Sequence, residues 1–554
     1  MAEDVTLLRA REGAAALMRG QYDKAVAAYD EALTAPEIAD FIEASIYSDR
    51  GVAKWRLKQT KEAIDDFNQS IQLSSENGAV YNNRGNALMD LGHPDEAVKD
   101  FDRAIALSPN YGAAYNNRGN ARVALGQYAL AFQDFRKAVE LMPRSAVPFN
   151  GRGTAHGELK RYHAAVRDLS RAISINPKYV AAYRHRADAY LGLGMYREAI
   201  ADATQAITLE PELPNPDLLL LRARAYVGDK KLNPALEDLN KAIEVKPDLV
   251  DAYIERGSVF AQARRFDDAI GDLTRAIELD PQNVKAYAMR ASAKFQAAPS
   301  AAANAEANTQ ANDDALNDVN QALQIAANDP VALRIRGNVY EALNRTDEGV
   351  ADYRNALAQD PFQAESRDAL QRLGQEVPPE EGLILGEPVE GWEIKEPQPG
   401  RYIASNPKYP ALRPELEMFG AGKPKILEWK LLKDALSGIG LLKYYAGDFG
   451  EGEETSIEYV AIVDTRANKV VSIEPHTWGS APAQWNWQAV SVVVTDPDGN
   501  ANEVQLRKVR QKAPAARDDF WGFERPDAGA SSDGRRAARG GGGGGGGMFD
   551  WLFR

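Results

Sequence analysis

Apolar and small residues recur along the first two thirds of the chain with the spacing of amphipathic helices. A segment such as NRGNALM (Asn83–Met89) is followed by one such as EAVKDFDRAI, and this pair of segments repeats. A Pro often closes the unit, because Pro cannot continue a helix interior. The small residue that opens the second segment returns most often after 34 residues, at Ala25, Ala63, Ala97, Ala131, Ala165, Ala199, Ala235, Ala269, Ala315 and Gly349. Each unit predicts two antiparallel helices that must stack on neighbouring units to bury their apolar faces.

These segments resemble the tetratricopeptide repeat (TPR) family over about residues 4–373. The resemblance implies an α-solenoid over residues 1–375, a right-handed superhelix of about ten helix pairs with a concave groove. A polar insertion near 299–313 interrupts the ninth unit, and its low complexity predicts a loop.

An Arg in the first helix and an Asp in the second recur together. Eight of the nine pairs are 16 residues apart, and the Arg290–Asp318 pair is wider because of the insertion. A ligand-binding ladder is one interpretation. We favour a structural one, in which a bidentate Arg–carboxylate contact fixes the packing of each helix pair, since nine equivalent ligand sites are implausible.

The resemblance places the first helix of each unit on the concave wall, where asparagines gather. An amide side chain offers an acceptor and two donors, which match one peptide group. Some peptide-binding TPR proteins use rows of Asn, so the resemblance implies peptide binding here; solvated polar filler is the alternative. The residues are Asn82, Asn83, Asn86, Asn116, Asn117, Asn120 and Asn150. Arg184, His185, Arg224 and Arg334 lie farther along and are candidates to supply positive charge for a carboxylate, or simply exposed surface residues.

The periodicity changes beyond Gln375. Residues 376–382 read as a linker, and residues 383–510 contain short alternating segments such as SIEYVAIVD and WQAVSVVV. Period-two alternation predicts strands, and turn residues at 464–468 and 496–499 predict hairpins. We expect a small antiparallel β-rich domain and recognise no family for it; 426–436 fits a strand or a short helix.

The β-rich region offers little sign of chemistry. His476 is its one His and has no nucleophile motif beside it. Trp478, Trp485 and Trp487 are candidates to stack on a sugar or a partner, but core or hairpin packing is the favoured interpretation. We therefore expect no catalytic residue, no metal site and no cofactor.

The last segment differs again. Residues 511–547 are poor in apolar residues and end in eight consecutive Gly, which predicts a disordered linker. A cluster of large apolar side chains follows in 548–554, and exposed apolar clusters often mark interaction sites. We expect a docking motif formed by Met548, Phe549, Trp551, Leu552 and Phe553, with a frayed terminus as the alternative.

Composition narrows the function. The net charge of -14 argues against a general nucleic-acid binder, and the chain has no Cys for a disulfide or a thiol nucleophile. No apolar stretch is long enough for a membrane span. No signal peptide is visible, which favours the cytoplasm, while a periplasmic or exported chain whose leader was removed stays open.

Together these features favour a scaffold or adaptor that binds protein or peptide partners in the groove. Two alternatives stay open: an enzyme or enzyme-activating subunit with its chemistry in residues 383–510, and a carbohydrate-binding module that uses the Trp cluster. The sequence identifies neither the partner nor the oligomeric state.

Overall fold

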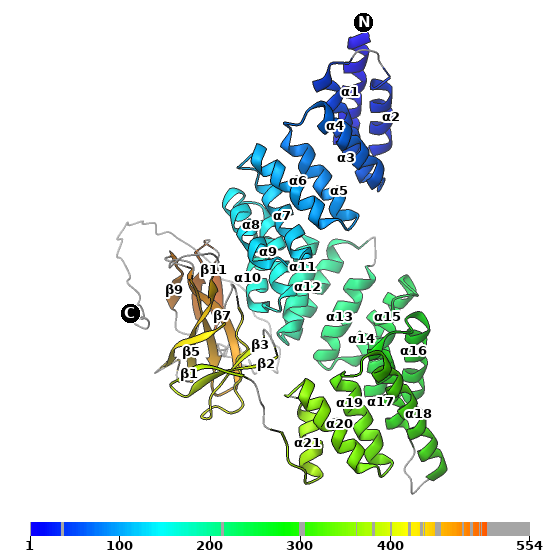
Figure 1. Ribbon diagram of the computed structural model, residues 1–554, viewed down its shortest axis with the longest axis vertical. Helices are drawn as coiled ribbons and strands as arrows, with labels where there is room; N and C mark the ends of the chain where they lie inside the picture. Colours follow the sequence, from blue (N-terminus) through cyan, green and yellow to red (C-terminus); the bar gives the residue numbers. More distant parts are fainter. Residues whose placement is uncertain are drawn as a thin grey trace, which may run out of the picture. The chain divides into compact units, whose positions relative to one another are not determined.

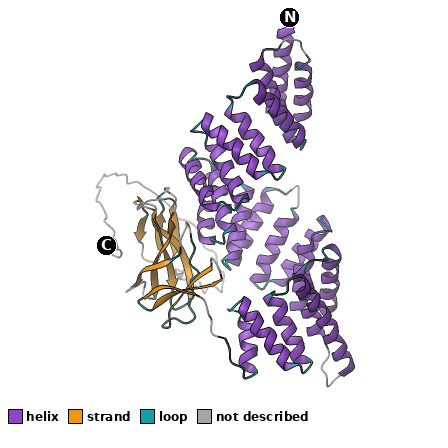
Figure 2. Ribbon diagram, in the orientation of Figure 1, coloured by secondary structure: helices purple, strands orange, loops and turns teal. Residues whose placement is uncertain are grey.

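The structure is a computed structural model (Figures 1 and 2). It describes residues 2–506 except 35–37, 212–214, 299–304, 362, 379–382, 399–400, 419–422, 433–435, 437, 449–455, 479–480, 488–490, 498 and 500. Two compact units divide the chain. One contains the helices and comprises the residues up to 385 with 395–402 and 417–423; the other comprises 386–394, 403–416 and the residues from 424 on.

The described helices form ten successive pairs and one final helix, as the sequence predicts. The pairs are α1 (Ala2–Met18) with α2 (Tyr22–Ala32), α3 (Asp40–Arg56) with α4 (Thr60–Leu73), α5 (Gly78–Asp90) with α6 (Pro94–Leu107), α7 (Gly112–Ala124) with α8 (Tyr128–Leu141), α9 (Ala146–Glu158) with α10 (Tyr162–Ile175), α11 (Val180–Gly192) with α12 (Tyr196–Leu209), α13 (Pro216–Gly228) with α14 (Leu232–Val245), α15 (Val250–Gln262) with α16 (Phe266–Leu279), α17 (Val284–Ala297) with α18 (Ala305–Ile325), and α19 (Pro330–Ala342) with α20 (Thr346–Gln359). The helix α21 (Ala364–Arg372) follows them, and its Leu370 is fully buried against α20 residues.

The two helices of a pair approach closely because a small residue faces a large one. A Cβ atom added to Gly85 would lie 2.7 Å from the Phe101 ring, and Phe101 is fully buried. The same conflict arises between Gly119 and Phe135. The glycine therefore makes room for the ring, which fills the space between the helices.

Tight turns join the helices within pairs. In nine of the ten pairs, one turn residue has a φ between 57° and 78°: Gly20, Lys58, Gly92, Gly126, Lys160, Gly194, Lys230, Arg264 and Asn344. Glycine adopts this left-handed conformation without steric cost, whereas an L side chain is strained in it.

Each repeated Arg joins the two helices of its pair, and most also reach the preceding pair, so we call these residues the hub arginines. All nine pair bidentately with the predicted Asp, through Nε and Nη2 at 2.6–3.0 Å. Nη1 commonly bonds the second helix of the preceding pair, as from Arg84 to Asn68 and from Arg118 to Asp102. The geometry is that of a packing contact.

The polar insertion differs from the expected loop. Residues 305–313 form the first turns of α18, which runs for 21 residues. Alanine, glutamate and glutamine favour helix, and Asn312 within this stretch is fully buried. The expectation of a loop throughout the insertion is therefore wrong for these residues.

Eleven described strands form three antiparallel sheets. The strands are β1 (Leu383–Val389), β2 (Trp392–Gln398), β3 (Arg401–Ser405), β4 (Lys425–Leu431), β5 (Ile439–Asp448), β6 (Ser456–Asp464), β7 (Lys469–Trp478), β8 (Ala481–Pro482), β9 (Gln484–Trp487), β10 (Ser491–Thr495) and β11 (Ala501–Gln505). The strand orders are β1-β2-β3, β4-β5-β6-β7-β8 and β11-β10-β9. The five-stranded sheet shares a buried core with the β9–β11 sheet, in which Val460 and Ile462 cluster with Val492 and Val494.

The predicted hairpins occur between β6 and β7 and between β10 and β11. Asp464 accepts hydrogen bonds from two backbone N–H groups of the first turn, and Asn468 there has a φ of 50°. Gly499 has a φ of 84° in the second turn. The ambiguous segment that begins at Ile426 contributes strand β4.

Candidate functional site

The first helices of the pairs present side chains that are not fully buried by the packing, and most of these are polar. The residue two positions after each hub arginine is the clearest set, because its side chain is partly or fully exposed in every pair. We call it the groove column: Val52, Asn86, Asn120, Thr154, Asp188, Arg224, Ser258, Ser292 and Asn338. Its chemistry changes along the chain, with two amides at Asn86 and Asn120, two charges at Asp188 and Arg224, and two hydroxyls at Ser258 and Ser292. Different stretches of this wall therefore suit different ligand groups.

The predicted asparagines form two groups. Asn82 and Asn116 are buried, and Asn117 links them: its Nδ2 donates to Asn82 Oδ1 at 3.0 Å, and its Oδ1 accepts from Asn116 Nδ2 at 3.2 Å. These three amides tie α5 to α7. Their donors and acceptors are largely committed to the wall itself.

The second group is available to a ligand. Among the described residues, no side-chain hydrogen bond is made by Asn83, Asn86 or Asn120, and all three are at least partly exposed. They lie on α5 and α7, helices that contact each other directly. We call them the free asparagines, and their amides can pair with peptide groups.

The side-chain hydrogen bond that joins α5 to α7 recurs between α9 and α11 but not between α7 and α9. Asn117 bonds the residue 35 positions before it, and His185 does the same with Asn150. At the intervening step the residue is Gly151, which has no side chain. A Cβ there would lie 2.9 Å from Asn116 Oδ1, a buried atom without a hydrogen-bond partner among the described residues. Gly151 therefore lets α7 and α9 approach at the cost of one unsatisfied acceptor.

His185 does not supply the positive charge considered for it. Its Nδ1 lies 3.1 Å from Asn150 Oδ1 and 2.9 Å from Thr154 Oγ1. Burial and, to a lesser degree, the charge of Arg184 lower the pKa of His185 to about 4. The ring is therefore neutral near pH 7 and acts as a hydrogen-bonding group. Arg184 is exposed and keeps its charge.

The middle of the wall is charged but internally paired. Arg224 contacts Asp251 at 2.8 Å and Glu255 at 3.1 Å, and Lys285 contacts Glu255 at 3.0 Å. These groups neutralise one another, so Arg224 is not a free cation for a ligand carboxylate.

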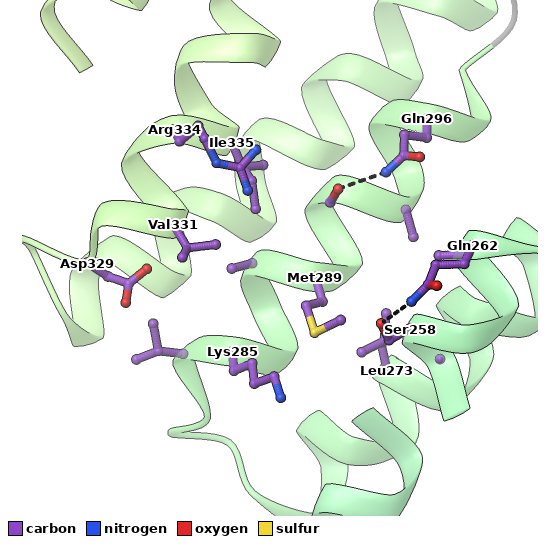
Figure 3. Close-up of a pocket in the computed structure, with 16 residues that line it drawn as sticks. Ser258, Gln262, Leu273, Lys285, Met289, Gln296, Asp329, Val331, Arg334 and Ile335 are labelled. Carbon is purple, nitrogen blue, oxygen red and sulfur yellow. Dashed lines mark hydrogen bonds between the residues drawn. The ribbon is translucent and has the colours of Figure 1, made fainter. Parts of the chain in front are cut away.

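A pocket of about 640 Å³ follows, between α15, α17 and α19 (Figure 3). We call it the Met289 pocket. Figure 3 shows Met289 and Lys285 in its middle, with Ser258 and Gln262 on one side and Asp329, Val331 and Arg334 on the other. Sequence reasoning named only Arg334 here. A signal was present, since Ser258 and Gln262 recur as Ser292 and Gln296 after 34 residues.

Trp485 and Trp487 in the β-rich unit take part in packing. Their rings stack with centroids 5.8 Å apart and pack against the core between the two sheets. Trp485 Nε1 also donates to the Pro475 carbonyl at 3.1 Å. These contacts agree with the favoured interpretation of hairpin packing. The side chain of Trp478 lies outside the described ones.

The one His of this unit belongs to a charged cluster on β5, β6 and β7. His476 Nδ1 lies 3.3 Å from Glu458 Oε2, and Lys443 lies 2.8 Å from the same carboxylate. Contact with His476, followed by Lys443 and Thr477, lowers the pKa of Glu458 to about 2. Within the described residues, no group of three side chains is arranged to hold a metal ion. The docking motif expected at 548–553 lies outside the described residues.

Comparisons with known proteins address the helical unit. Models of the tetratricopeptide repeat family match residues 44–77, 82–146, 150–214 and 220–284. The comparison with curated proteins gives no match. None of the described helices has the length and apolar character needed to cross a membrane.

Three of the similar solved structures illustrate the extent of the likeness. A tetratricopeptide repeat protein from Parabacteroides merdae is 22% identical over 44% of this chain and 94% of its own, with a TM-score of 0.37. YrrB, described as a TPR protein with an unusual peptide-binding site, is 26% identical over 34% of this chain and 95% of its own, with a TM-score of 0.28. Yeast Tom70 is 14% identical over 68% of this chain and 95% of its own, with a TM-score of 0.34.

Proposed function

We propose that the first helices of the helix pairs bind an extended peptide segment of a partner protein. The matches to tetratricopeptide repeat models within residues 44–284 support a protein-interaction scaffold in general terms. The observation that carries the proposal is the set of free asparagines, whose amides have no side-chain hydrogen bond among the described residues. A peptide group needs one acceptor and one donor, and an Asn amide offers both.

The spacing of the wall supports an extended ligand. Packed helices are about 8–10 Å apart, and an extended chain rises about 3.3 Å per residue. Successive first helices therefore meet about every third residue of such a peptide. Backbone recognition of this kind tolerates many sequences, so side-chain preference must come from elsewhere on the wall.

A selection with the full chain tests this proposal. The immobilised protein is presented with a random library of twelve-residue peptides, and the Kd of each enriched peptide is measured by fluorescence anisotropy. Replacing the free asparagines by Ala in one triple variant should raise that Kd roughly 100-fold, since each lost hydrogen bond costs about 1 kcal/mol. Helicity should not change, because these side chains bond no other described side chain.

A matched triple variant serves as the control. Gln69, Lys99 and Arg103 are exposed on the second helices α4 and α6, and their replacement by Ala should leave the Kd unchanged. Failure to enrich any peptide, or equal affinities for the wild-type chain and the triple Asn variant, would refute peptide binding by the free asparagines.

The β-rich unit is proposed to serve the scaffold rather than to catalyse a reaction. The packing of Trp485 and Trp487 against the core gives no support to a sugar-stacking surface. Turnover of any substrate that is abolished by Glu458→Gln would favour the enzymatic alternative, since this carboxylate anchors the charged cluster of the unit.

A further inference from the structure

The Met289 pocket has an apolar lining that suits a large side chain. Met289, Val331 and Ile335 contribute to it from α17 and α19, and Val331 is 43% exposed. Its volume of about 640 Å³ falls within the range of about 300–1,000 Å³ that is typical of ligand pockets. The unbranched thioether of Met289 adapts readily to the shape of an apolar guest.

One cation in this pocket has no counterion. Among the described residues, no carboxylate lies within ion-pair distance of Arg334. Lys285 is already paired with Glu255 at 3.0 Å. Asp329 is held as the cap of α19, where its Oδ1 accepts from the Ala332 N–H at 2.7 Å. With Lys285 paired and Asp329 committed to the helix cap, the Arg334 guanidinium is the charged group of this lining that makes no hydrogen bond or ion pair among the described residues, and a guanidinium binds carboxylates bidentately.

The opposite side supplies neutral polar groups at repeat spacing. Gln262 Nε2 donates to Ser258 Oγ at 3.5 Å, and Gln296 Nε2 donates to Ser292 Oγ at 3.0 Å (Figure 3). In this arrangement each glutamine keeps its carbonyl oxygen for a ligand N–H. Two such acceptors on neighbouring helices suit the backbone of a peptide that passes over the pocket.

We propose that the Met289 pocket selects partner peptides in which an acidic side chain stands next to a large apolar one. The apolar side chain enters the space lined by Met289 and Val331, and the carboxylate pairs with Arg334. This inference rests on the proposed peptide-binding function and adds the sequence preference that backbone recognition by the free asparagines lacks.

The test uses a peptide of this chemistry, the labelled and capped hexapeptide Met-Phe-Asp-Trp-Leu-Phe, which is the sequence of residues 548–553. We expect it to bind the full chain, and its Kd to rise at least tenfold with Arg334→Glu and several-fold with Val331→Ser. A second hexapeptide with Lys in place of Asp should show the reverse preference, binding Arg334→Glu more tightly than wild type. Arg103→Glu, at an exposed site on α6, is the matched charge control and should change neither Kd.

Four results would overturn the inference. Equal binding of both hexapeptides by the wild-type chain would exclude Arg334 as the selector. The same would follow if Arg334→Glu did not bind the Lys hexapeptide more tightly than the wild-type chain does. Binding that appears only after deletion of 548–554 would identify the chain's own segment, rather than a partner, as the occupant. If library peptides bind through the free asparagines but ignore Arg334→Glu, the proposed function stands and only the pocket assignment fails.

Discussion

Two hub arginines differ in one respect that makes their structural role testable. Among the described residues, Arg84 is the one cation that contacts Asp100, whereas Asp134 is contacted by Arg118 and also by Arg122 at 2.7 Å. Both guanidinium groups lie over a tyrosine ring, Tyr81 or Tyr115, at 5.4–5.6 Å. The Nη1 of Arg84 donates to Asn68, whereas that of Arg118 pairs with the half-exposed Asp102. Replacing each hub by Met keeps most of the aliphatic stem and removes the charge.

The expected loss in free energy of unfolding depends on which cations still contact each carboxylate after the substitution. The side chain of Asp100 is 8% exposed, and Arg84→Met leaves it without a cation among the described residues. Removing one partner of a buried pair costs about 3–5 kcal/mol, and we take about 3 kcal/mol because Arg84 is partly exposed. Arg118→Met leaves Asp134 paired with Arg122, so only charged hydrogen bonds are lost, at about 1.5 kcal/mol.

Hydrogen exchange is the suitable assay, because repeat arrays open locally and need not unfold in one step. Amides of α5 and α6 should lose roughly 100-fold in protection with Arg84→Met, since about 1.4 kcal/mol corresponds to a factor of ten. Amides of α7 and α8 should lose roughly tenfold with Arg118→Met. Adding Asp100→Leu to Arg84→Met should recover much of the loss, because no unpaired charge then remains.

Equal losses in the two single variants would show that the second cation on Asp134 is irrelevant. Unchanged protection in both, combined with loss of peptide binding, would show that the hub arginines form a ligand ladder and would refute the packing interpretation.

Three further predictions concern backbone strain and pH. Gly92→Lys should cost about 1 kcal/mol and Lys58→Gly should gain up to about 1 kcal/mol in thermal unfolding, because both positions have positive φ; opposite signs would contradict this. Contact with His476 lowers the pKa of Glu458 to about 2. The contribution of this carboxylate to stability is therefore present above its ordinary pKa near 4.5 and is lost as pH falls toward 2. Glu458→Gln should flatten this acid dependence of unfolding, followed by near-UV circular dichroism. Burial lowers the pKa of His185 to about 4, so stability should fall as pH drops from about 6.5 to 4, and NMR should show its midpoint near 4 rather than near 6.5.

The helical fold was predictable because the same solution recurs along the chain. The same contact between two helices recurs in pair after pair. In the sequence it is marked by a hub Arg with its Asp, or by a glycine that faces an aromatic ring. A single copy would be ambiguous, whereas repetition in register makes the contact readable from spacing alone. In the β-rich region, alternation located strands such as β6, but it did not determine which strands share a sheet, because that depends on long-range pairing.

The candidate site was predictable only in outline. Spacing placed the asparagines on neighbouring helices but did not distinguish Asn117, which bonds Asn82, from Asn83, which is free. It also suggested a charge at His185, where burial instead favours the neutral ring. These differences arise from neighbours 35 residues away in sequence, and a repeat pattern does not specify what each neighbour contributes.

The contrast between two positions on the first helices indicates where binding preference resides. The hub position is Arg in nine pairs because its main contact, a bidentate bond to an Asp on the second helix, is the same in each. Two residues farther along, the groove column has no common partner, and its chemistry and its contacts change from pair to pair. A position that carries the same residue in every pair serves a packing contact that every pair makes. A position that varies but stays at least partly exposed is shaped by an interaction that differs from pair to pair. A ligand lying along the wall meets each pair once, at a different part of itself, so it imposes that kind of variation. Under the proposed function, the order of amides, paired charges and an apolar pocket with Arg334 would give the ligand a direction. Its backbone would meet the free asparagines, and its acidic and apolar side chains would meet the Met289 pocket.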